Sequence, residues 1–395
     1  MLVRNLTQYA VVLTEEQKRM QELQRQLKKK EELAAADSEE QAAGDKPERV
    51  GERAKLVCRA GAVALLVSAV QPRMAPSDSV RDAVAEIMAA LAVSPELRGL
   101  LVQQGGVRAL LGTLLTSDAP KAGMALRALR QQRDKHAAFA LAKIGISVPP
   151  HLAFADVRQV ARLLLCLLLE DTEPQALLMR FEALLALTNL ASAPPGSAAD
   201  IRGYLANDLE GFPVIETCVL SEHPMVRRAA TELVCNLVYD QRVFERFAAN
   251  SDSGVPPPEQ DTSCRIVEID DAVESEEDLS YRSKRLHLLV ALADVDDMPT
   301  RSAAAGALAV LSSDPRCCRY LFLAHPRASS IFLSLVRDTE EEGESDDGQA
   351  AAVGFKHRVA VIWANAASCG DSRVSDALRR ESGVVESLRL MASDS

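Results

Sequence analysis

The sequence has little aromatic content, and this limits the folds it can adopt. Phe, Tyr and Trp together make up 4% of the 395 residues, with a single tryptophan. Leu and Ala dominate the apolar residues, which amount to 48% of the chain. Because both are strong helix formers, the interior must be filled by small and aliphatic side chains on helices. The composition therefore argues against an all-β sandwich.

The sequence also lacks paired cysteines and long apolar runs. Its eight cysteines include no C-x-x-C pair, and Cys317 and Cys318 are adjacent, so they are poorly placed to bridge each other. The most apolar stretch, 160–169, is short and contains Arg162, whereas a membrane span needs about 20 apolar residues. Residues 1–10 lack the apolar core of a secretory signal. We expect a cytoplasmic protein with reduced, buried thiols and no membrane association.

An excess of positive charge and the common catalytic motifs are missing as well. Lys and Arg number 45 against 56 Asp and Glu, giving a net charge of −11, which disfavours nucleic acid as a partner. None of the six histidines belongs to an H-E-x-x-H motif or lies beside cysteine at zinc spacing. Neither a phosphate-binding loop nor a G-x-S-x-G motif occurs. We therefore expect no metal, no cofactor and no enzymatic activity.

What the sequence does contain is a repeated helical pattern. Similar amphipathic segments begin at Val80, Asp134, Arg180, Arg227, Arg301 and Lys356. Each carries one apolar row at helical spacing. These rows are Val84, Met88, Leu91; Ala137, Leu141, Ile144; Ala183, Leu187, Leu190; Ala230, Val234, Leu237; Ala304, Leu308, Leu311; and Val359, Trp363, Ala366. The rows predict helices that bury the same face in every repeat.

A second type of helix accompanies the first and opens with glycine. These helices begin at Gly61, Gly105, Gly211 and Gly383. Glycine at such a turn can adopt the left-handed conformation that ends one helix before the next begins. The repeat length of about forty to fifty residues is typical of armadillo or HEAT units. Because one unit cannot bury its apolar face alone, the sequence predicts an all-α, armadillo- or HEAT-like right-handed α-solenoid.

Composition divides the chain into two regions. Residues 1–49 are predicted to form a partial repeat, a charged helix over residues 15–36 with a thin stripe of leucines, and a linker. Residues 50–395 form the repeat domain. Within it, we expect acidic flexible insertions near 251–280 and 338–349, where hydrophobicity is too low to offset the entropy of ordering.

Asparagine recurs inside the apolar repeat helices. Asn189, Asn236 and Asn365 share one position, directly before the last residue of each row. Asparagine is a mediocre helix former, so its recurrence requires a reason. Its amide can satisfy carbonyls of the neighbouring repeat, or a ladder of amides can hold the backbone of an extended partner. Sequence spacing leaves both alternatives open.

Two further features of the repeat helices have alternative interpretations. A basic residue opens most of them, namely Arg81, Arg180, Arg227, Arg301 and Lys356. This row is either ordinary solubilising charge or a docking edge for acidic segments. Trp363 lies on an apolar row, so it either packs in the core or anchors a partner from an exposed face.

The repeat segments resemble those of the UCS-domain family, the myosin-directed chaperones. LLVQQGGVRALLGTLL, HAAFALAKIGIS, FEALLALTNLAS, RRAATELVCNLV and RSAAAGALAVLSS, preceded by RNLT at residues 4–7, occur in the family's order. The resemblance implies a solenoid whose concave groove binds the myosin motor domain, helps it fold and protects it from aggregation. Within this family-based expectation, the client-contact candidates are Asn189, Asn236, Asn365, Arg227, Tyr204 and Tyr239.

The resemblance also bears on other partners. No tetratricopeptide domain of the kind that docks heat-shock chaperones is visible, which argues against direct coupling to such a chaperone. The alternative function is a general armadillo-repeat scaffold joining folded proteins. If the asparagines contact the client, replacing all three with alanine should weaken client holding and leave helicity and melting temperature nearly intact.

Overall fold

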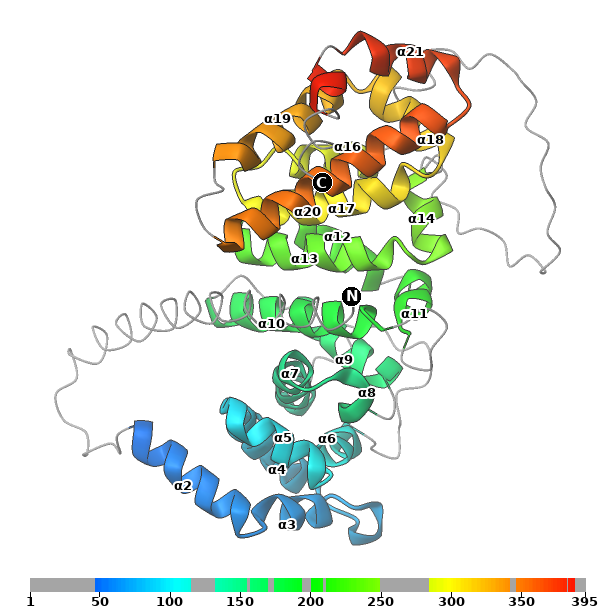
Figure 1. Cartoon of the computed structure of the whole chain (residues 1–395). Coiled ribbons are helices and arrows are strands. Elements are labelled where there is room, and N and C mark those ends of the chain that lie inside the picture. Colours follow the sequence, from blue (N-terminus) through cyan, green and yellow to red (C-terminus); the bar gives the residue numbers. More distant parts are fainter. Residues whose placement is uncertain are drawn as a thin grey trace, which may run out of the picture.

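The computed structural model describes residues 47–114, 132–154, 157–169, 174–193, 200–208, 211–248, 284–341, 346–381 and 383–387. Every regular element in these ranges is helical, as the sequence predicted. Figure 1 shows the helices stacked from α2 and α3 at one end to α21 at the other. None of the described helices is both long and apolar enough to cross a membrane.

One helix of each repeat stacks on its counterpart in the next repeat. We call these the ladder helices: α4 (Asp78–Ala92), α7 (Gln132–Ser147), α10 (Pro174–Ala191), α13 (Pro224–Leu237), α17 (Met298–Leu311) and α20 (Asp346–Ser368). Each contacts the next along the chain. The carboxyl ends of α10, α13, α17 and α20 lie toward α11, α14 and α18, at the right of Figure 1.

Shorter helices cover the ladder and join its members. On the amino-terminal side they are α2 (Pro47–Arg59), α3 (Ala62–Ala69), the 3₁₀ turn η1 (Pro72–Met74), α5 (Pro95–Gln103), α6 (Gly106–Leu114), α8 (Pro150–Ala153) and α9 (Val157–Leu168). Further along come α11 (Arg202–Asn207), α12 (Gly211–Val219), α14 (Gln241–Ala248), α16 (Lys284–Leu292), α18 (Pro315–Arg319), the π-helical turn η3 (Tyr320–Ala324), α19 (Ala328–Glu341) and α21 (Ser372–Arg380). Residues 383–387 are also helical.

The predicted apolar rows form the interior. Every member of the six rows is buried except Leu91, which is partly buried and packs against the same core. A single cluster of buried side chains runs from Cys58 to Val384, so the repeats share one continuous core. Trp363 is 1% exposed and belongs to this core, which settles its packing role.

Two of the four glycines predicted to turn the chain have the expected left-handed conformation. Gly61 and Gly105 have φ values of 94° and 83°, in the left-handed region that side chains with a Cβ rarely adopt. Gly211 instead allows a close approach, because a Cβ there would lie 2.5 Å from Leu165 Cδ1. Glycine therefore serves both to turn the chain and to let neighbouring helices meet.

The described residues of the second expected acidic insertion lie in helices. Helix α19 continues to Glu341 and α20 begins at Asp346, so much of 338–349 is helical. Glutamate is a good helix former, and acidic residues at a helix amino end favour the helix dipole. The insertion near 251–280 lies outside the described residues, as do residues 1–46.

Candidate functional site

The three asparagines each link one ladder helix to the ladder helix before it. Asn189 Nδ2 donates to the Gly145 carbonyl of α7 at 3.0 Å, and Asn236 Nδ2 donates to the Thr188 carbonyl of α10 at 3.2 Å. Asn365 Nδ2 donates to Ser312 Oγ at 2.9 Å and to the Ala309 carbonyl of α17 at 3.3 Å. The amide donors therefore have the inter-repeat role that was one of the two sequence alternatives.

The oxygen atoms of these amides differ from the nitrogen atoms in their hydrogen bonding. Among the residues that the structure describes, none donates a hydrogen bond to the Oδ1 atom of Asn189, Asn236 or Asn365. All three side chains are only half-buried. Because the amide is bifunctional, an Nδ2 fixed on the scaffold leaves a positioned oxygen able to accept from a peptide N–H.

The two candidate tyrosines come to the same edge as the asparagines. Tyr239 is the second residue after α13 and is 62% exposed, whereas Tyr204 on α11 is half-buried. The two segments meet where a Cβ on Gly203 would lie 3.2 Å from Asp240 Oδ2. Burial raises the pKa of the Tyr204 hydroxyl, and a hydrogen bond with Arg162 opposes that shift.

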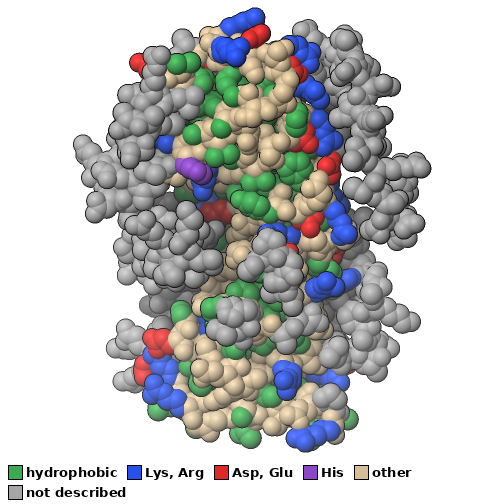
Figure 2. Space-filling model, turned by 45° about the vertical axis from the view of Figure 1, so that its right-hand side comes forward, with side chains coloured by type: hydrophobic (Ala, Val, Ile, Leu, Met, Phe, Trp, Pro, Cys, Tyr) green, Lys and Arg blue, Asp and Glu red, His purple; other side chains and the backbone are tan. Residues whose placement is uncertain are grey.

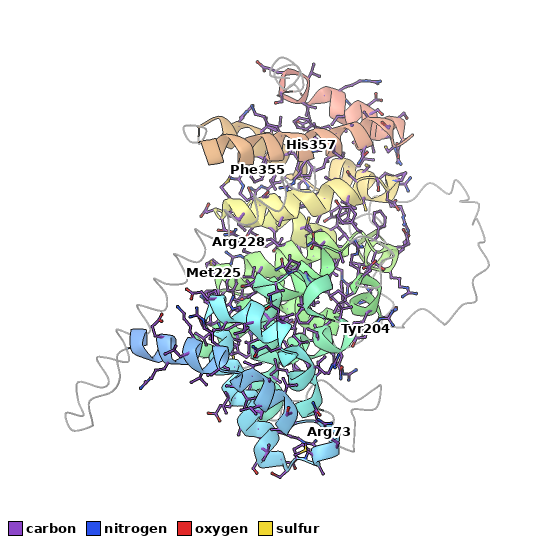
Figure 3. The ribbon with its side chains drawn as sticks, turned by 60° about the horizontal axis from the view of Figure 1, so that its bottom comes forward. Arg73, Tyr204, Met225, Arg228, Phe355 and His357 are labelled. Carbon is purple, nitrogen blue, oxygen red and sulfur yellow. The ribbon has the colours of Figure 1, made fainter. Side chains whose placement is uncertain are left out.

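Arg227 does not join this group. It lies in the first turn of α13, whereas Asn236 lies near the helix's carboxyl end. Figure 3 shows this separation, with Arg228 and Met225 on one side of the molecule and Tyr204 on the other. Nine residues of helix correspond to about 14 Å, so only a peptide that runs along α13 for about four residues or more could contact both Arg227 and Asn236.

Arg227 and Arg301, two members of the basic row, bind helix ends. Arg227 Nη1 donates to the Ser221 carbonyl at 3.3 Å, just after α12. Arg301 Nε donates to the Ala293 carbonyl at 3.3 Å, just after α16. Cations at helix carboxyl ends bind unsatisfied carbonyls and interact favourably with the negative end of the helix dipole. These two arginines therefore stabilise turns within the repeat, a role that neither sequence alternative included.

A buried ion pair at the ladder was missed by the sequence analysis. Lys143 of α7 occupies the position that asparagine occupies in α10, α13 and α20. Its Nζ lies 2.7 Å from Glu182 Oε1 of α10 and 4.5 Å from the centroid of the Phe139 ring. A lysine at an asparagine position was the signal available, but its partner lies 39 residues away. No cluster of three or more potential metal ligands occurs among the described side chains.

Replacing Asn189, Asn236 and Asn365 together with alanine is now expected to lower stability. Each hydrogen bond contributes about 1 kcal/mol, and the bonds lie in separate interfaces, so a total of about 3 kcal/mol is expected. Thermal unfolding followed by circular dichroism should show a melting temperature lower by roughly 4–5 °C, because the entropy of unfolding of a chain this long is large. An unchanged melting temperature would contradict the inter-repeat role. Client binding per folded molecule, measured well below the transition, remains the test of the contact role.

Comparison with known proteins identifies relatives over most of the chain. The chain is 32% identical to Ring assembly protein 3 of Schizosaccharomyces pombe over 266 residues, covering 66% of this chain and 30% of that protein. It is 32% identical to Protein unc-45 homolog B of Mus musculus over 273 residues, covering 68% of this chain and 24% of the relative. The chain thus spans about a quarter to a third of the length of these relatives. No family model matches the sequence.

Solved structures give the same result for the fold. UNC-45 from Drosophila melanogaster superposes with a TM-score of 0.64 at 26% identity, covering 90% of this chain and 37% of that one. A structure of the UNC-45 chaperone, described by its molecular features critical for binding and folding muscle myosin, superposes with a TM-score of 0.57 at 22% identity, covering 90% of this chain and 34% of that one. The armadillo-like solenoid expected from the repeats is therefore the fold of this chain.

Proposed function

Since this chain belongs to the UCS family of UNC-45-like proteins over about two thirds of its length, we propose that it is a myosin-binding chaperone. The homology to UNC-45 proteins, together with the shared solenoid, is the observation that carries this proposal. The client is the myosin motor domain, held in a partly unfolded form along the ladder helices. Binding is the only chemistry that the proposal requires.

The carboxyl ends of the ladder helices are the proposed client-binding edge. We define this edge by Asn189, Asn236, Asn365, Tyr204 and Tyr239. The asparagine oxygens are positioned acceptors, and an exposed tyrosine offers a large rigid surface with a polar tip. Figure 2 shows this side of the molecule, where apolar side chains gather along the middle of the face and charged ones line its right margin.

Affinity would come from the number of contacts. Each hydrogen bond from a client N–H to an asparagine oxygen contributes about 1 kcal/mol net. Several such contacts on one chain add through a high effective concentration, so a client with many exposed N–H groups is held better than a folded one. Arg227 binds the end of α12, near the amino end of α13 and away from the proposed edge. It can therefore contact only a client that extends from this edge along α13.

Suppression of aggregation tests the function directly. A myosin motor domain heated alone should scatter light within minutes, and an equimolar amount of this chain should suppress the scattering. An unrelated heat-labile enzyme, treated in the same way, is the control for specificity and should gain little protection. Failure to protect the motor domain, with this chain still folded at the assay temperature, would contradict the proposal.

A general scaffold for folded proteins is the alternative function, and the same assay separates the two. A scaffold would bind folded partners without reducing aggregation of a heated client. Recruitment of a heat-shock chaperone is a separate question, which is decided by mixing the purified proteins and measuring co-elution.

A further inference from the structure

In α10, α13 and α20, one stripe of side chains packs on the ladder helix before it, whereas Lys143, at the asparagine position of α7, contacts Glu182 of the following helix α10. The stripe comprises the asparagine position and the positions three, seven and ten residues earlier. Asn236 contacts α10 from this stripe, Glu182 contacts Lys143 of α7, and Arg358 Nη1 donates to the Ser302 carbonyl of α17 at 2.9 Å. In three different helices, the stripe therefore faces the preceding ladder helix.

The apolar stripe positions are buried wherever a preceding ladder helix exists. Three residues before the asparagine position, the side chains are 0% exposed in all five later ladder helices: Ala140, Ala186, Leu233, Ala307 and Ile362. Ten residues before it, Met179, Val226, Thr300 and Phe355 are at most 5% exposed. Burial at these positions is thus a regular consequence of stacking.

In α4 the same stripe is exposed. Val80 is 39% exposed and Ile87 is 44% exposed, and the stripe residues Ala83 and Ala90 are also exposed. No ladder helix precedes α4 among the described residues. The described part of the chain has ten exposed large apolar side chains, and seven of them lie in the range from Leu56 to Val93. A solenoid end normally has a polar outer face, so an apolar stripe here marks a helix-binding surface.

We propose that residues 15–36 of this chain form a helix that covers the exposed stripe of α4. Met20, Leu23 and Leu27 have the same spacing as Val80, Ala83 and Ile87, so the segment offers a matching apolar stripe. Two helices with such stripes can interdigitate along their length. The predicted helix then takes the place of a ladder helix at the open end of the stack.

Charge and chain length favour this segment over other occupants. Residues 15–36 contain six basic and five acidic side chains, and residues 18–30 hold all six basic ones but only one acidic one, whereas α4 exposes Asp82 and Glu86 beside its stripe. The basic middle of the segment and the acidic border of the stripe attract each other, which favours docking of residues 18–30 on α4. The segment is tethered to α2 through residues 37–46, which can extend up to about 35 Å, so the chain itself keeps the segment near this end of the solenoid.

Photo-cross-linking from α4 tests the assignment in the full chain. The photoreactive residue p-benzoylphenylalanine is placed at Ile87, and cross-linked peptides are identified by mass spectrometry. The expected result is a cross-link within one chain to a peptide from residues 15–36. Leu23→Asp combined with Leu27→Asp should reduce its yield several-fold, and the melting temperature of this variant shows whether the solenoid remains folded.

A control and an isotope mixture separate the other occupants. The same photoreactive residue at Leu220, which is 65% exposed at the other end of the ladder helices, should give no cross-link to residues 15–36. Mixing chains of two isotopic compositions distinguishes contacts within one chain from contacts between copies. Cross-links from position 87 only to a second copy, or to no part of residues 15–36, would overturn the proposal.

Discussion

Replacing Lys143 with alanine is expected to destabilise the protein by about 3–5 kcal/mol, because it leaves Glu182 buried without its cation. The side chains of Lys143 and Glu182 are only 5% and 11% exposed, and Glu182 Oε2 already has no hydrogen-bond partner. Urea unfolding followed by circular dichroism measures this loss as a lower midpoint.

Two control variants test whether this loss of stability comes from breaking the buried ion pair. Arg379 and Asp376 form an exposed pair at 3.0 Å, so Arg379→Ala should change stability by less than about 1 kcal/mol. Lys143→Met combined with Glu182→Leu replaces the charges with apolar side chains and should recover most of the lost stability. If Lys143→Ala unfolded at the wild-type urea midpoint, the buried pair would not hold α7 on α10.

Replacing Tyr239 with alanine is expected to weaken binding of the myosin motor domain by roughly tenfold, about 1.4 kcal/mol. Tyrosine is a frequent energetic centre of protein interfaces, and Tyr239 lies at the proposed client-binding edge. Because its side chain is 62% exposed, its removal should leave the melting temperature unchanged. Titration of a labelled motor domain with each variant gives the dissociation constants.

Leu220 provides the matched control for Tyr239. It is similarly exposed, at 65%, but it follows α12 near the amino end of α13. Leu220→Ala should therefore leave the affinity within about twofold of the wild type. Equal losses for both variants would indicate binding without a preferred edge, and a lower melting temperature for Tyr239→Ala would indicate a structural role.

The sequence predicted the fold well because the repeat pattern contains most of the required information. Burial depends on which residues share a helix face, and the spacing within each row shows this directly. Helix starts were less accurate. Arg227 and Arg301 are the fourth residues of α13 and α17, which begin at Pro224 and Met298. Proline near a helix's first position suits its fixed φ, so these helices begin before the amphipathic pattern becomes visible.

The candidate site was less predictable because its contacts join different repeats. The recurring asparagines were found from position alone, but their partners lie 44 to 56 residues away. Which carbonyl an amide binds depends on how two helices are offset, and one helix's sequence does not determine that offset. The guanidinium contacts of Arg227 and Arg301 with helix ends were missed for the same reason, since a charge pattern does not show where a side chain turns.

Hydrogen exchange of this chain, with and without a bound myosin motor domain, is the most direct test of the central claim that a polypeptide binds along the carboxyl ends of the ladder helices. The account predicts slower exchange at the ends of α10, α13 and α20 and in the turn that contains Tyr239. Exchange unchanged at those ends in a complex shown to be formed, with protection elsewhere on the solenoid, would contradict it.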